Sequence, residues 1–234
     1  MSRPPRIVVP TRSVLAEVVE RCRADARPSN GDPDSLRVAQ VWSIRTLHAA
    51  YSLGATRDEL RSDLVRCIGL VEQLAGTIGQ PPLDCDEREG YLSAVWMTGL
   101  GALFDQDLVR SGLSLVVSPF QDALISRIAQ VAGVEIDAVQ PMSTQAIHAD
   151  LLGGLDSDEE SRPRAIAAFL ADYENRMPSF PWHAPGADDV PPCGYWSFET
   201  AAVLGQQTKD AWLLTGMRGF PSEILQFEDE VRGD

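Results

Sequence analysis

Apolar residues recur at helical spacing through the first third of the chain. The series from Val14 to Cys22 predicts one helix. A second begins near Asp34 or Ser35 and stops at Gly54, a residue that suits a left-handed C-cap. Thr56 and Glu59 have the spacing of a capping box and predict a third helix toward Gly79. Residues 1–12, with three prolines, are expected to form an irregular arm.

The same spacing continues to the end of the chain. It predicts helices over 84–104, from Ser118–Pro119 to Gly133 and over 141–152. After a capping box at Ser157–Glu160, it predicts another from Arg164 that ends before Pro178. Residues 178–193 are rich in proline and predict a long loop. A last helix is expected within 194–205. Only Leu113–Val117 is a strand candidate.

These patterns predict an all-α protein, a helical bundle of roughly seven to nine helices. We expect a single all-helical domain over 13–234, with halves of about 13–80 and 84–234 packed together. A chain of 234 residues can bury such a core without metals or disulfides.

Charge narrows the function classes. The net charge of −14 disfavours binding to nucleic acid, because phosphates would be repelled. A basic partner protein would be attracted, although acidity can also serve solubility alone. Residues 150–234 hold 16 acidic and six basic residues, so this half is the more probable binding face. No apolar run is long enough to span a membrane, no secretion signal is recognisable, and the cysteines fit reduced thiols, so we expect a cytoplasmic protein.

No catalytic, metal or cofactor pattern is recognisable. His48, His148 and His183 are scattered, and no cysteine pair has zinc-ligand spacing. We interpret His48 as a satisfied, half-buried residue and His148–Asp150 as a weak pair. We therefore expect no enzyme activity, no metal and no cofactor.

The densest candidate segment is Gly194–Glu199, which contains Tyr195, Trp196 and Phe198. Aromatic residues of this kind bury large areas and favour a core position. Glu199 follows them directly, and a buried carboxylate must find donors or shift its pKa upward. We expect it to tie the preceding loop to the helix through backbone N–H groups or an arginine, with direct partner contact as the alternative.

The chain resembles a known family in two segments. Gly194-Tyr-Trp-Ser-Phe-Glu-Thr-Ala-Ala is similar to the signature of the C-terminal half of the PoNi immunity proteins. Ala50-Tyr-Ser-Leu-Gly-Ala-Thr-Arg-Asp-Glu-Leu60 resembles a segment of their N-terminal half. The motif positions of this resemblance, which we interpret as structural, are Tyr51, Gly54, Gly194, Tyr195, Trp196, Phe198 and Glu199.

The resemblance implies an all-helical cytoplasmic immunity protein that binds and neutralises a cognate PoNe-type DNase toxin. Such a partner would be a basic nuclease, with no direct contact of this chain to nucleic acid or membrane. A helical scaffold or regulatory adaptor unrelated to toxins, or a hydrolase with dispersed carboxylates, are the alternatives. The expected contacts are six acidic residues: Asp156, Asp158, Glu159, Glu160, Asp188 and Asp189.

Overall fold

The structure is a computed structural model, and it describes residues 12–25, 27–28, 31–135, 146–177, 196–205 and 208–225. The described residues form ten α-helices, one short 3₁₀ helix and two very short strands, so the predicted all-α class is confirmed. The helices slightly exceed the expected seven to nine because α5 and α10 are short additions. In chain order the elements are α1 (Arg12–Asp25), α2 (Pro33–Leu53), α3 (Arg57–Ile78), β1 (Leu83–Asp84), α4 (Arg88–Ala102), α5 (Gln106–Leu113), β2 (Val116–Val117), η1 (Pro119–Gln121), α6 (Ala123–Val131), α7 (Ala146–Leu155), α8 (Arg162–Arg176), α9 (Phe198–Leu204) and α10 (Thr208–Leu213).

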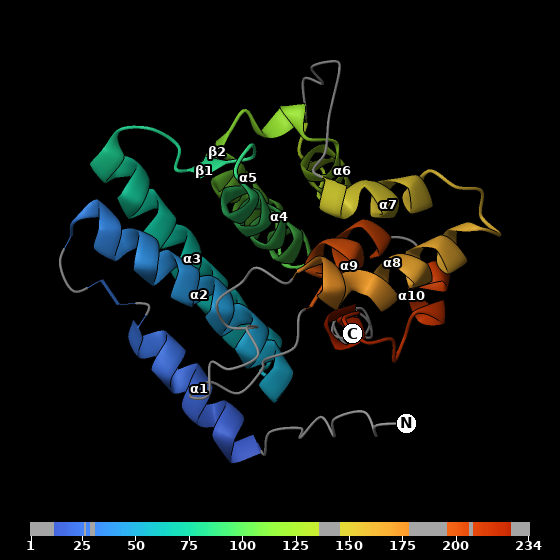
Figure 1. Ribbon diagram of the computed structural model, residues 1–234, viewed down its shortest axis with the longest axis horizontal. Coiled ribbons are helices and arrows are strands. Elements are labelled where there is room, and N and C mark those ends of the chain that lie inside the picture. The colour runs from blue at the N-terminus through green and yellow to red at the C-terminus, as the bar shows by residue number, and fades with distance from the viewer. Residues whose placement is uncertain are drawn as a thin grey trace, which may run out of the picture.

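The boundaries between α2 and α3 follow the predicted caps. Asp32 accepts hydrogen bonds from the first backbone N–H groups of α2, and Gly54 ends that helix at φ 83°. The Thr56–Glu59 capping box forms, with each side chain bonded to the other residue's backbone. Because the link between them is short, α2 and α3 lie side by side (Figure 1). Helix α1 packs along α2.

The segment before α4 differs from the expected helix start at residue 84. Leu83 and Asp84 pair in parallel with Val116 and Val117, inside the predicted strand candidate. The Asp84 carboxylate accepts from the Asp86 N–H at 2.9 Å, which makes a turn. Helix α4 therefore begins at Arg88, because the backbone of residues 83–84 bonds to 116–117 and the Asp86 N–H bonds to the Asp84 side chain.

Two further helix starts differ from the sequence pattern. Pro119 opens a 3₁₀ turn, and Asp122 then caps α6. The expected capping box at Ser157 does not form, because the Ser157 hydroxyl donates to the Gly153 carbonyl of α7 at 2.9 Å. Asp158 accepts the turn's backbone N–H groups instead, and α8 begins at Arg162.

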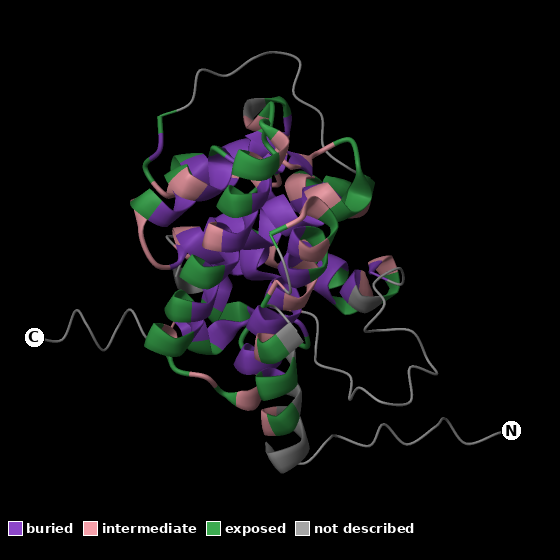
Figure 2. Cartoon of the chain, turned by 90° about the vertical axis from the view of Figure 1, so that its left-hand side faces the viewer, coloured by how far each residue is buried: buried purple, intermediate pink, exposed green. Residues whose placement is uncertain are grey.

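Helix α4 lies at the centre of the fold (Figure 1), and every residue from Tyr91 to Gly101 is buried. Buried residues fill the middle of the molecule (Figure 2). It contacts α2, α3, α5, α6 and α9. Gly99 permits the closest of these approaches, since a Cβ there would lie 2.9 Å from the Glu199 Cα. Helix α4 thus contacts α2 and α3 from the first half of the chain and α6 and α9 from the second. The single-domain expectation stays a prediction, and no helix in the described ranges has both the length and the apolarity to cross a bilayer.

Candidate functional site

The two segments that carry the family resemblance meet in space. The Trp196 indole N–H donates to the Ser52 hydroxyl at 2.8 Å, across 144 residues of sequence. The Trp196 ring packs edge-on against Tyr51, with centroids 4.6 Å apart. The start of α9 is therefore fastened to the end of α2.

His48 extends this contact into the core. The Trp196 backbone N–H donates to His48 Nδ1 at 3.3 Å, and the imidazole lies 4.6 Å from Trp96 and 5.0 Å from Phe198 between ring centroids. The side chain is fully buried rather than half-buried. Burial lowers the pKa of His48 to about 3, although the Glu199 charge opposes this shift. A neutral ring is the form that can accept the Trp196 N–H.

Tyr51 joins α2 to the last described segment. Its hydroxyl donates to the Glu223 carboxylate. Burial, and then this hydrogen bond, raise the pKa of Tyr51 above its ordinary value. Gly54 then turns the chain in the left-handed region, which favours glycine. The motif positions Tyr51 and Gly54 thus both lie at the C-terminal end of α2.

Glu199 is fully buried at the start of α9. His148 Nε2 lies 3.1 Å from its Oε1 atom, and the Ser197 hydroxyl donates to the same oxygen at 2.6 Å. Burial alone would raise the pKa of Glu199, but the hydrogen bonds and charge of His148 and the Ser197 hydroxyl hold it below its ordinary value. The buried carboxylate does find donors, but a histidine from α7 and a serine hold it where an arginine or backbone groups were expected.

Two tyrosines continue the polar contacts away from Glu199. The Tyr91 hydroxyl lies 3.0 Å from His148 Nδ1, and the Trp96 indole N–H donates to the Tyr173 hydroxyl at 3.0 Å. Burial, and then the Glu199 charge, raise the pKa of Tyr173. These side chains link α4, α7, α8 and α9. We call Tyr91, Trp96, His148, Tyr173, Ser197 and Glu199 the buried polar cluster.

The cluster contains hydrolase residue types in an arrangement that does not suit nucleophilic catalysis. An activated serine needs its base within hydrogen-bond reach. Here Ser197 and His148 both bond one Glu199 oxygen, and all three side chains are fully buried. Within the ranges that the structure describes, no group of three or more His, Cys, Asp or Glu residues could hold a metal ion. The polar groups of the cluster bond one another, and only the second Glu199 oxygen, Oε2, has no hydrogen-bond partner within the cluster.

The predicted acidic contacts at 156–160 form an exposed turn between α7 and α8. Asp156 pairs with Arg127 at 2.7 Å. Asp158 accepts the N–H groups of Glu160 and Ser161 at 3.1 and 2.9 Å, and the bonds from Ser161 hold the pKa of Asp158 below its usual value. Asp156 and Asp158 therefore also have internal roles. We call Asp156, Asp158, Glu159 and Glu160 the acidic turn.

Other predicted positions lie outside the described residues: Asp188, Asp189, Gly194 and Tyr195. The role of His148 was missed because its only sequence signal was its nearness to Asp150. In the structure, Asp150 pairs with Arg176 at 2.5 Å, and His148 turns to Tyr91 and Glu199. The sequence held no further signal for the two buried partners of His148.

The fold and site define an all-helical protein with a buried polar cluster and an exposed acidic turn. The model of the C-terminal part of the PoNe immunity proteins (PoNi) matches residues 120–224. The model of the N-terminal part of the same proteins matches residues 40–111. The chain belongs to the PoNi family of immunity proteins.

A solved structure supports the fold. The protein PA2201 from Pseudomonas aeruginosa has a TM-score of 0.57 and 16% sequence identity, over 100% of this chain and 93% of that one. At this identity the likeness concerns the fold alone. No curated protein matches the chain significantly.

Proposed function

We propose that this protein neutralises a PoNe-type DNase toxin in the cytoplasm by stoichiometric binding, without turnover. The observation that carries the proposal is the pair of family matches, which together cover 40–111 and 120–224. The full burial of His148, Ser197 and Glu199 is consistent with a protein that acts through its surface.

Electrostatics supplies the physical basis for binding. A DNase must present a basic surface to the phosphates of its substrate. This chain carries a net charge of −14, which attracts such a surface and accelerates encounter. We propose that the acidic turn, together with Asp188 and Asp189, covers the toxin's DNA-binding surface or blocks its active site.

The family motif has a different role in this proposal. Tyr51, Trp196, Phe198 and Glu199 are buried or partly buried and contact one another or the core. We propose that the seven motif positions hold the fold, and that the acidic surface determines which toxin is bound.

Co-expression with its cognate PoNe-type nuclease tests the function. The nuclease alone should kill the host and degrade its DNA. Expressed together, the two proteins should leave the DNA intact and purify as one complex. Cells that die equally with and without this chain would contradict the proposal.

A further inference from the structure

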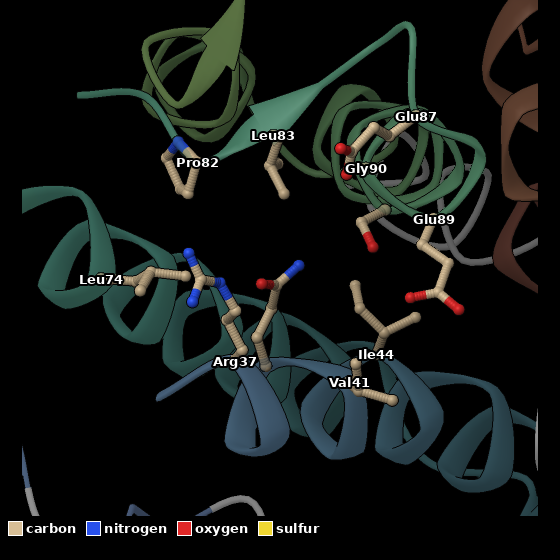
Figure 3. Close-up of a pocket in the computed structure, with 11 residues that line it drawn as sticks. Arg37, Val41, Ile44, Leu74, Pro82, Leu83, Glu87, Glu89 and Gly90 are labelled. Carbon is tan, nitrogen blue, oxygen red and sulfur yellow. The ribbon is translucent and has the colours of Figure 1, made fainter. Parts of the chain in front are cut away.

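A small cavity lies between α2, the end of α3, β1 and the start of α4 (Figure 3). Its volume is about 220 Å³, and its apolar walls include Val41, Ile44, Leu74 and Leu83. Sites for drug-sized molecules and cofactors usually measure about 300–1,000 Å³. This cavity, which we call the α2–α4 cavity, has the size of a receptacle for one long side chain.

Two polar side chains also line the α2–α4 cavity. Gln40 is 8% exposed and Ser93 is 7% exposed. Neither the Gln40 amide nor the Ser93 hydroxyl makes a hydrogen bond to any part of the chain that the structure describes. Both side chains still reach the solvent in the cavity. A ligand that donates hydrogen bonds would take the place of that solvent.

Negative charge gathers at the α4 side of the cavity. Glu87 and Glu89 are exposed at the start of that helix, and neither makes an ion pair with a described residue. Glu87 stands at the N-cap position but makes no side-chain cap hydrogen bond. Arg37 on the opposite wall has its own carboxylate partner, Asp34, at 3.2 Å. The two glutamates are therefore available to a cation from outside.

We propose that the α2–α4 cavity receives one arginine side chain of the toxin. This proposal rests on the function proposed above. The aliphatic stem of an arginine packs on apolar walls while its guanidinium keeps five donors for polar partners. The Gln40 amide oxygen and the Ser93 hydroxyl accept from the guanidinium, and Glu87 or Glu89 neutralises its charge. Arginine is also among the residues that carry most binding energy in protein interfaces.

A small probe tests the cavity without any toxin. We expect N-acetyl-arginine amide to shift the backbone NMR signal of Gly90 and the side-chain amide signal of Gln40 saturably in the full chain. The neutral, isosteric N-acetyl-citrulline amide should not do so, and the Glu87→Gln/Glu89→Gln variant should weaken the shifts. Equal shifts with citrulline, or shifts confined to other residues, would overturn the assignment.

The complex supplies the second test. Glu87→Gln/Glu89→Gln should weaken binding to the co-expressed nuclease by about tenfold or more. The matched pair Glu17→Gln/Glu135→Gln removes the same charge from exposed positions on α1 and after α6, and it should change affinity by less than about threefold. Equal losses in both pairs would overturn the inference while leaving the immunity function intact. A wild-type chain that binds no nuclease would instead defeat the proposed function, and with it the toxin as occupant.

Discussion

A neutral histidine lies at the junction between the two family segments. His48 accepts the Trp196 N–H only while its ring is unprotonated, and its folded-state pKa is lowered from 6.5 to about 3. The unfolded chain binds a proton at this position below about pH 6.5, and the folded chain does not. Acidification therefore favours the unfolded state between those two values. The junction is built for neutral pH.

The pH dependence of unfolding tests this at one residue. Asn at position 48 keeps an acceptor but cannot titrate. The difference in unfolding free energy between wild type and His48→Asn should shrink by about 2 kcal/mol from pH 7 to pH 5. Urea unfolding at pH steps measures it. A difference that stays constant over this range would show that His48 titrates normally in the folded protein.

The buried polar cluster shows what one residue's sequence context can and cannot predict. Three aromatic residues before Glu199 correctly indicated burial, because large rings bring their neighbours into the core. The partner of Glu199 could not be predicted, because His148 lies 51 residues earlier on a different helix. Only the packing of α7 on the core brings them together.

At the level of elements, α9 packs closely on α4 at Glu199 because Gly99 of α4 has no side chain. A Cβ atom at Gly99 would lie 2.9 Å from both the backbone N and the Cα of Glu199. Neither helix backbone can yield without disturbing the cluster between them. Gly69 on α3, by contrast, has no atom within 4 Å of a would-be Cβ.

Two alanine substitutions should therefore act in opposite directions. Gly99→Ala should destabilise the protein by about 1–3 kcal/mol through overpacking. Gly69→Ala should stabilise it by about 0.5–1 kcal/mol, because alanine is the better helix former. Chemical denaturation of both variants provides the comparison. If Gly99→Ala were as stable as wild type, the close approach of α4 and α9 would be wrong.

Helix ends were predictable where one local side chain decides them. Thr56 with Glu59 and Gly54 behaved as their patterns indicated. The start of α4 was not predictable, because the pairing of residues 83–84 with 116–117 is set by distant sequence. The α2–α4 cavity escaped prediction for the same reason: its walls come from four separate elements.

At the scale of the whole molecule, negative charge should control the rate of encounter with a basic toxin. Within the acidic turn, Asp156 pairs with Arg127 and Asp158 accepts the turn's backbone N–H groups, so we choose the exposed Glu160 for substitution. Removing its charge should weaken the long-range attraction while Asp158 still holds the turn.

Stopped-flow or surface-based kinetics can measure this effect. Raising the ionic strength from about 0.05 to 0.5 M should slow association of the wild-type chain about tenfold or more. Glu160→Gln should lower the rate at low salt and flatten its salt dependence more than Glu17→Gln does, because both remove one exposed charge but only Glu160 lies in the acidic turn. An association rate that does not respond to salt would contradict electrostatic steering.

Neutralisation by a one-to-one complex is tested most directly by titrating the cognate nuclease with this protein in a DNA-cleavage assay. With the nuclease well above the dissociation constant, its activity should fall linearly and reach zero at equal molar amounts. Full loss of activity at a small fraction of one equivalent would indicate turnover. Undiminished cleavage at a large excess would show that the chain does not inhibit the nuclease at all.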